Sequence, residues 1–156
     1  SASSNTASWP GGTAVVDRDL VLRKVADLER YLDQVSEYRD ITAEQYREDW
    51  RTQRIVERTP QMAIEVCVDL ANHVIADRGL RVPATYAESF EVLGEAGLLG
   101  AARQEAMVRI AKFRNVIVHD YARVDPAIVV QILREHLGDF AGFRAAVLGW
   151  VSRAAS

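Results

Sequence analysis

The stretch ERTPQMAIEVCVDLANHVIADRG, residues 57–79, decides the fold class of this chain. Its dense apolar positions continue a helical pattern that begins before Pro60 and resumes at Met62. A proline inside a helix removes a backbone donor and crowds the preceding turn, so we expect a kink at Pro60 rather than a helix end. Gly79 is a suitable C-terminal cap, and Pro83 beyond it cannot continue the helix.

The residues before this stretch predict two helix starts. Residues 17–38 carry apolar side chains at three- and four-residue spacing, which is typical of a helix that buries one face. Thr42 is followed three residues later by Gln45, the spacing of a capping box, so the second helix is expected to begin at about residue 43. Residues 1–16 are rich in Ser, Gly, Pro and Ala, and we expect a flexible tail or a cloning remnant there.

A short helix is predicted directly after the long central one. Thr85 and Glu88 have the spacing of a second capping box, and Gly94 or Gly97 is expected to end the helix that they open.

The last third of the chain predicts two more long helices. One covers about residues 101–120, and Pro126 opens another that reaches about residue 149. No segment alternates convincingly as a strand would. The sequence therefore predicts an all-α, up-and-down bundle of four long helices plus a short one, in a single domain over residues 17–150.

Composition narrows the classes of protein. The 156 residues suffice for one domain with a core, and the chain is 49% hydrophobic and 26% charged, as in ordinary globular proteins. No apolar run approaches the roughly 18–20 residues that span a bilayer. A net charge of −3 argues against bulk electrostatic coating of nucleic acid. The single cysteine, Cys67, has no disulfide partner, which favours a cytoplasmic location.

The sequence KFRNVIVHDY, residues 112–121, places polar and ionisable side chains in a segment that otherwise predicts a core-forming helix. At 100° per residue, Arg114 and Tyr121 lie within about 20° of each other, whereas Asn115 and His119 share a neighbouring face. Arg114 and His119 are about 140° apart, too far to hold one phosphate together. Either the helix unwinds near His119, or the site is assembled from two chains across a twofold axis.

The side chains of this motif suit chemistry on RNA without a metal or cofactor. Histidine can move protons near neutral pH, and arginine can hold a phosphate through two hydrogen bonds. RNA carries its own nucleophile, the 2′-hydroxyl, and two His119 side chains across a dimer could serve as acid and base. For any one of these residues a structural role stays open, since helix C-termini favour histidine. The spacing of these residues, taken together, is what favours a functional site.

The spacing also resembles the signature of HepT-like toxins in the HEPN superfamily. Arg114 and His119 are separated by four residues, Asn115 follows Arg114, and Tyr121 stands two residues after His119. Three longer segments resemble the family in the same order, with the motif helix and its exit last: residues 57–79, 82–99 and 113–129. The resemblance covers about residues 17–145, and it departs at Pro60, where an ordinary helix former is expected.

This resemblance implies a HEPN-type homodimer with metal-independent endoribonuclease activity in a cleft at the subunit interface. Arg114 and His119 match the catalytic pair, and Asn115 matches the supporting polar group. Tyr121 matches the tyrosine that a cognate minimal nucleotidyltransferase antitoxin, of MntA type, modifies with AMP. The chain would then be the toxin of a type VII toxin–antitoxin system that cuts tRNA or mRNA. Its rival is a non-catalytic module that binds nucleotides or presents substrates to a nucleotidyltransferase.

Two other polar patterns in the sequence each have a functional and a structural interpretation. The arginine stripe, Arg47, Arg51, Arg54 and Arg58, falls within about 60° on the second helix, and it predicts either a track for RNA phosphates or a solvated face. Glu65, Asp69 and His73 recur every four residues, which suggests either metal ligands or a polar ridge that contacts Arg114 from a neighbouring helix.

Overall fold

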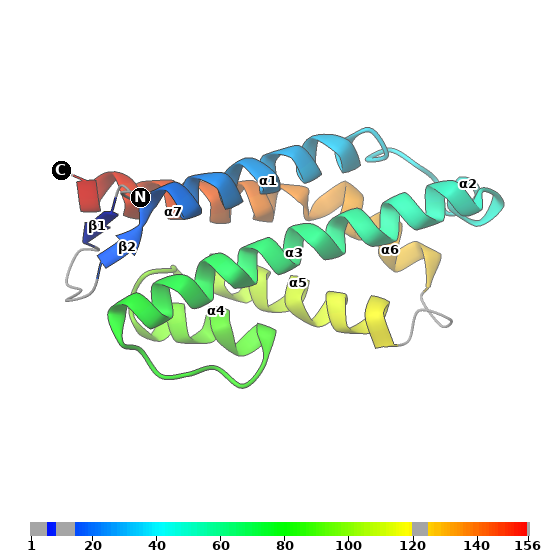
Figure 1. Cartoon of the computed structure of the whole chain (residues 1–156). Helices are drawn as coiled ribbons and strands as arrows, with labels where there is room; N and C mark the ends of the chain where they lie inside the picture. The colour runs from blue at the N-terminus through cyan, green and yellow to red at the C-terminus, as the bar shows by residue number, and fades with distance from the viewer. Residues whose placement is uncertain (1–5, 9–14, 120–124, 156) are drawn as a thin grey trace.

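The computed structural model describes residues 6–8, 15–119 and 125–155, and its helices confirm the all-α class. The four long helices are α1 (Arg18–Ser36), α3 (Trp50–Arg78), α5 (Ala101–His119) and α7 (Leu137–Ala155). Three shorter helices lie between them in the chain: α2 (Ala43–Glu48), α4 (Tyr86–Glu95) and α6 (Pro126–Glu135). The long helices alternate in direction along the chain, as an up-and-down bundle requires (Figure 1).

The main core lies between the four long helices. Helix α1 packs against α3 and α7, α5 packs against the same two helices, and α4 covers α3 and α5 (Figure 1). The largest fully buried side chains include four on α3, α4 and α7: Leu70, Phe90, Phe140 and Phe143. Cys67 is among the core residues, and burial raises the pKa of its thiol. No described helix has the length and apolarity needed to cross a membrane.

A second, smaller core fills one end of the bundle. It joins the end of α1, the two short helices α2 and α6, the first half of α3 and the last turns of α5 through these side chains: Val35, Ile41, Tyr46, Val56, Phe113, Ile117, Val129, Val130 and Leu133. The hydroxyl of Tyr46 on α2 donates to the Glu57 carboxylate on α3, and burial together with this bond raises the tyrosine pKa. The second core therefore fixes the end of α5 that carries the motif.

Two of the predicted helix boundaries were wrong, each for a local reason. The second helix is split at Asp49, whose backbone is extended and whose carboxylate caps α3 by accepting from the Arg51 amide and the Thr52 hydroxyl, both at 3.0 Å. The last helix is split at His136, whose ring nitrogen Nδ1 lies 3.0 Å from a carboxylate oxygen of Asp139. Helix α3, by contrast, runs continuously past Pro60.

The structure also contains two short strands that the sequence pattern did not predict. Strands β1 (Thr6–Ser8) and β2 (Val15–Asp17) pair antiparallel, with Ala7 opposite Val16. The pair lies beside the end of α7 and the start of α1 (Figure 1). Each strand has three residues, too few for a period-two pattern to be recognised in the sequence. The division of the chain at residue 16 stays a prediction.

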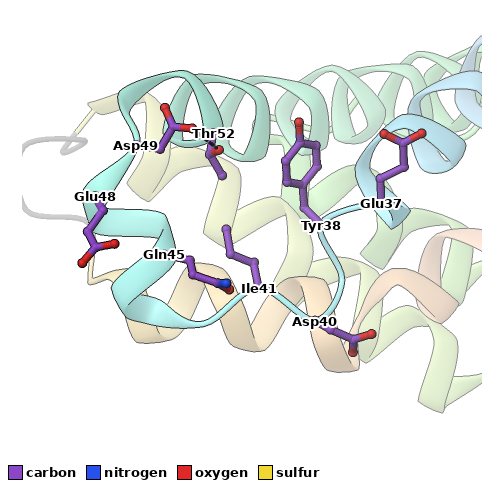
Figure 2. A pocket seen from close by; sticks show the side chains of 8 residues that line it. All are labelled: Glu37, Tyr38, Asp40, Ile41, Gln45, Glu48, Asp49 and Thr52. Carbon is purple, nitrogen blue, oxygen red and sulfur yellow. Dashed lines mark hydrogen bonds between the residues drawn. The ribbon is translucent and has the colours of Figure 1, made fainter.

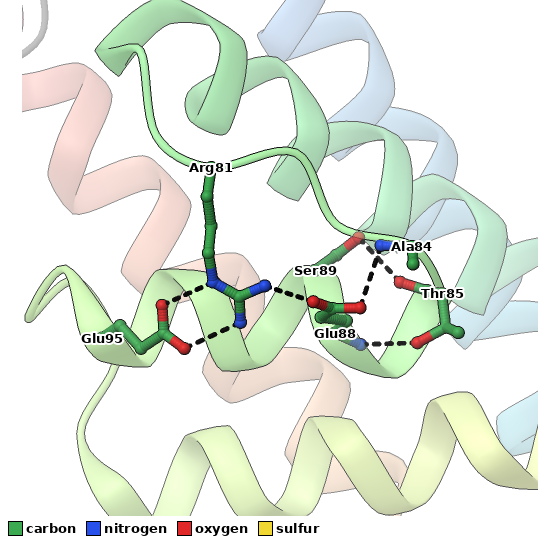
Figure 3. Close-up of polar contacts among 6 residues, drawn as sticks. All are labelled: Arg81, Ala84, Thr85, Glu88, Ser89 and Glu95. Atoms are coloured by element: carbon green, nitrogen blue, oxygen red, sulfur yellow. Dashed lines mark hydrogen bonds and ion pairs between the residues drawn. The ribbon is translucent and has the colours of Figure 1, made fainter.

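An ion-pair clamp ties the loop after α3 to helix α4 (Figure 3). Arg81 donates to both oxygens of Glu95, at 2.8 and 2.9 Å, and also to Glu88. Thr85 caps α4 as predicted, but the Glu88 carboxylate accepts from the Ala84 amide, so the capping box is only half formed. Arg81 lowers the pKa of both glutamates, so the clamp stabilises the fold at neutral pH and is lost as acid protonates them.

Gly79 ends α3 as predicted, with a left-handed backbone at φ 65°. A Cβ at this position would meet no atom within 4 Å, so Gly79→Ala is expected to lower the free energy of unfolding by about 1–2 kcal/mol through backbone strain alone. Urea denaturation measures this change. Gly138→Ala in α7 is the matched control, because its Cβ also enters open space and its backbone is helical. An equal loss in both variants would contradict the strain explanation.

Candidate functional site

The motif occupies the last two turns of α5. Phe113 and Ile117 point into the second core, whereas Asn115 and Val116 are exposed and Arg114 is half-buried. The four-residue spacing of the two apolar residues fixes which face of the helix is buried. His119 is the last residue of α5. Its side chain, together with Asp120 and Tyr121, lies outside the described residues, so their predicted roles remain predictions.

Arg114 is held by two neighbouring helices. Its Nη2 donates to Oε1 of Glu65 on α3 at 3.0 Å, and its guanidinium carbon lies 4.7 Å from the centre of the Tyr86 ring at the start of α4. The Arg114 side chain is only 15% exposed. An ion pair and a cation–π contact from different helices restrict the guanidinium to one orientation, in surroundings drier than a free surface.

The remaining donors of Arg114 are not fully used. Its Nη1 lies 3.5 Å from the Asn115 side-chain oxygen, at the limit of a hydrogen bond. Its Nε is buried and has no hydrogen-bond partner among the residues that the structure describes. A guanidinium offers five N–H donors, so this side chain retains capacity for an anion after Glu65 is bound. A phosphate oxygen is a chemically suitable acceptor.

Glu65 and Asp69 pair with different parts of the bundle, whereas the Nε2 atom of His73 is buried and has no hydrogen-bond partner among the described residues. Glu65 faces Arg114 and also accepts from the Gln61 amide at 3.3 Å, which confirms the expected contact between the polar ridge and Arg114. Asp69 pairs with Lys24 of α1 at 3.2 Å. Within the described ranges, no three His, Cys, Asp or Glu side chains come together in the way a metal site needs.

The regularity of α5 matters for how Arg114 and His119 could reach one substrate, either through unwinding of the helix or through assembly from two chains. The helix is regular through His119, so it does not unwind before that residue. The backbone thus keeps the two positions about 140° apart around the helix axis. Because His119 is the last described residue of α5, both arrangements that the sequence leaves open, unwinding near His119 and assembly across a twofold axis, stay predictions.

The arginine stripe is divided between two helices. Arg47 lies on α2, whereas Arg51, Arg54 and Arg58 lie on α3 beyond the break at Asp49, so the prediction of one continuous stripe was wrong. All four side chains are exposed, and none forms an ion pair within the described part of the chain. The role of the arginine stripe in RNA binding stays a prediction.

A pocket of about 520 Å³ opens at the same end of the bundle but contains no motif residue. Figure 2 shows its lining, which comes from the end of α1, helix α2 and the start of α3 and includes four carboxylates: Glu37, Asp40, Glu48 and Asp49. Hydrogen bonds from the Arg51 amide and the Thr52 hydroxyl lower the pKa of Asp49. Carboxylates that are ionised at neutral pH repel phosphate, so this pocket is unsuited to RNA.

Sequence reasoning missed Tyr86 as a neighbour of Arg114. Tyr86 is the first residue of a short helix and has no distinctive spacing to the motif, 28 residues away in the sequence. Only the packing of α4 on α3 and α5 brings the ring to the guanidinium. The packing of helices, and not a local signal in the sequence, therefore completes this part of the site.

Comparisons with known proteins identify the family of the chain. The profile of the family described as ribonuclease HepT-like matches residues 28–147. An mRNA nuclease HepT from Shewanella oneidensis is 29% identical over 126 residues, which span 80% of this chain and 93% of that protein. A tRNA nuclease HepT from Aphanizomenon flos-aquae is 27% identical over 97 residues, or 62% of this chain and 66% of that protein.

The fold is likewise shared with a solved toxin. The structure of a tri-AMPylated HEPN toxin from Shewanella oneidensis, in complex with an MNT antitoxin, superposes with a TM-score of 0.78 at 26% identity. The superposition covers 85% of this chain and 98% of that chain. The resemblance read from the motif and its flanking segments is thus confirmed at the level of the whole domain. The chain belongs to the ribonuclease HepT-like family.

Proposed function

We propose that this protein is a metal-independent endoribonuclease, and that it acts as the toxin of a type VII toxin–antitoxin system. The observation that carries the proposal is the orientation of the half-buried Arg114 side chain by Glu65 and Tyr86. A cation held in this way stabilises charge on a phosphate more effectively than a mobile surface arginine does. Relatives of this chain include a named mRNA nuclease and a named tRNA nuclease.

The proposed reaction is an internal transesterification of RNA. A base removes the 2′-hydroxyl proton, and the 2′-oxygen forms a bond to the adjacent phosphorus. The bond from phosphorus to the 5′-oxygen breaks, and an acid gives that oxygen a proton. The products are a 2′,3′-cyclic phosphate and a 5′-hydroxyl, so one proton is taken up and one is released. Arg114 and Asn115 would bind the phosphate, while the His119 side chains of two subunits would serve as base and acid.

The homodimer is part of this proposal because positions 114 and 119 of a regular helix lie about 140° apart. Two copies related by a twofold axis place the same helix on both sides of one cleft. Val116 is exposed beside Asn115 on this helix, and it offers apolar surface for such a contact. We expect the dimer to form in the cytoplasm, where both the proposed RNA substrate and the proposed antitoxin would be present.

His119→Ala is expected to lower the rate of RNA cleavage about 100- to 10,000-fold, the usual contribution of a general acid or base. Cleavage of total tRNA and of a model mRNA by the purified protein measures this change. Arg109→Ala is a suitable control, because Arg109 is an exposed arginine of the same helix that pairs only loosely, at 3.6 Å, with Glu105. A wild-type protein that binds AMP or ATP but leaves both RNAs intact would favour the nucleotide-binding module instead.

Tyr121 is the proposed AMP acceptor for a cognate minimal nucleotidyltransferase. AMP attached there would place an anionic phosphodiester close to the motif, where it would compete with RNA phosphate for Arg114. After treatment with the antitoxin and ATP, intact-mass analysis is expected to show added AMP on the wild type and an unchanged mass for Tyr121→Phe. Equal addition to both proteins would contradict the assignment of the tyrosine.

A further inference from the structure

We propose that Trp50, Arg51 and Arg54 form a binding surface for single-stranded RNA, with Trp50 stacking on an unpaired base. These three residues are called the Trp50 surface below. The inference rests on the proposed ribonuclease function and deepens it, because it specifies the form of RNA that the enzyme holds. It assigns a role to the most unusual exposed side chain at the motif end of the bundle.

The Trp50 side chain is unusually exposed for its large size. It is the first residue of α3 and is 62% exposed, whereas Trp150 on α7 is 3% exposed and packs in the main core. Trp50 adds nothing to either core. A large aromatic ring that does not pack in the cores of its own chain has most of its area available to a ligand.

Two cations flank the ring. The guanidinium carbons of Arg51 and Arg54 lie 5.4 and 5.8 Å from its centre, within the range of a cation–π contact. Neither arginine forms an ion pair within the described part of the chain. Asp49 caps α3 and Glu57 accepts from Tyr46, so neither carboxylate forms an ion pair with these two arginines, although the charge of Asp49 interacts with that of Arg51. The two guanidinium groups therefore keep free donors beside the ring.

A ring with unpaired arginines beside it suits a nucleic acid more than a protein. Each nucleotide presents a flat π-face and a phosphate, which are the ligands of the ring and of the two guanidinium groups respectively. A duplex hides its base faces in the stack, so only an unpaired base can lie on Trp50. These matching charges and surfaces are the reason for choosing single-stranded RNA as the occupant.

The position of the Trp50 surface fits a route to the motif. At 100° per residue, Arg51, Arg54, Arg58 and Glu65 lie within about 60° of one another on α3. Glu65 pairs with Arg114 of the motif helix at 3.0 Å. Arg58 continues the exposed positive charge along α3 beyond Arg54. A strand anchored on Trp50 can therefore extend along α3 toward the end of α5.

The test uses full-length protein with His119→Ala, so that RNA is bound without being cut. The probe is a fluorescein-labelled 12-nucleotide RNA, offered as a single strand and annealed to its complement, and anisotropy gives Kd. Adding Trp50→Ala is expected to weaken single-strand binding about 5- to 150-fold, the range for loss of one stacked base, with less than about a twofold change for the duplex. Trp50→Tyr is expected to retain most of the affinity.

The arginines are tested by salt dependence. Arg51→Ala and Arg54→Ala are each expected to reduce the slope of log Kd against log salt by about 0.7, the value for one phosphate of a single strand. Arg30→Ala on α1 is the matched control, because Arg30 is also exposed and also lies over an aromatic ring, that of Tyr31, at 5.2 Å. Its slope and affinity are expected to stay unchanged.

Several results would overturn the Trp50 surface. Unchanged single-strand affinity in Trp50→Ala, equal losses for single strand and duplex, or no binding by the parent protein would each do so. A dimer that becomes a monomer on Trp50→Ala in light scattering would identify a subunit contact instead. The ribonuclease proposal fails separately: if wild-type protein never cuts RNA but the Trp50 effect on binding is present, the surface stands and the enzymatic function does not.

Discussion

Arg114→Ala is expected to lower the rate of RNA cleavage at saturating RNA by about 100- to 1000-fold, the usual loss when one preorganised donor to a developing oxyanion is removed. The guanidinium is oriented by Glu65 and Tyr86 before any substrate arrives, so little reorganisation is needed at the transition state. The rate at saturation is the informative quantity, because a residue that only attracts RNA would raise KM instead. Single-turnover cleavage of a defined mRNA measures it.

Two further variants separate the charge of Arg114 from its geometry. Arg114→Lys keeps the positive charge but cannot form two parallel hydrogen bonds, so it is expected to restore only a small part of the rate. Arg109→Ala removes an exposed arginine of the same helix and should cut RNA at the wild-type rate. Full activity in Arg114→Lys would show that the orientation imposed by Glu65 and Tyr86 is irrelevant to catalysis.

Phe143→Ala is expected to lower the free energy of unfolding by about 3–5 kcal/mol, which is a large fraction of the stability of a domain this size. Phe143 is 0% exposed and makes edge-to-face contacts with Phe90 on α4, at 5.4 Å between ring centres, and with Trp150, at 6.2 Å. The substitution leaves a cavity between α4 and α7 and removes both ring contacts.

Chemical denaturation followed by circular dichroism measures the Phe143→Ala change. Leu148→Ala on the same helix is the control, since Leu148 is 36% exposed and its truncation leaves no enclosed cavity. It is expected to cost less than about 1 kcal/mol. If Phe143→Ala were as stable as Leu148→Ala, the core as described here would not be the element that holds α4 and α7 together.

The helical class was predictable because the apolar spacing is strong over long segments. The bounds of α1 and α5 and the cap at Gly79 follow from periodicity and from residues with a known terminal preference. The breaks at Asp49 and His136 are less visible, because helical periodicity continues on both sides of each. Asp49 carries an N-cap signal, a carboxylate followed three residues later by Thr52, but the only irregularity predicted in this region was a kink at Pro60.

The site was predictable in part. Spacing along one helix placed Arg114 and Asn115 together near its end, and a ridge of three polar residues at four-residue spacing on α3 pointed to Glu65 as a neighbour. Tyr86 was not predictable, because its contact with Arg114 arises from the packing of α4 and not from a repeat in the sequence. Trp50 was not predictable as a binding residue, because the sequence does not separate an exposed tryptophan from a buried one, and only its exposure in the fold distinguishes it from the buried Trp150.

The measurement that tests the central claim most directly is cleavage of a defined RNA by wild-type protein in excess EDTA, with the new 3′ ends identified by mass spectrometry. Attack by the 2′-hydroxyl predicts that the rate is undiminished in EDTA and that the new ends are 2′,3′-cyclic phosphates, with cleavage about 100- to 10,000-fold slower in His119→Ala. Cleavage that stops in EDTA, or that leaves 3′-hydroxyl ends, would contradict the metal-free mechanism built on Arg114 and His119.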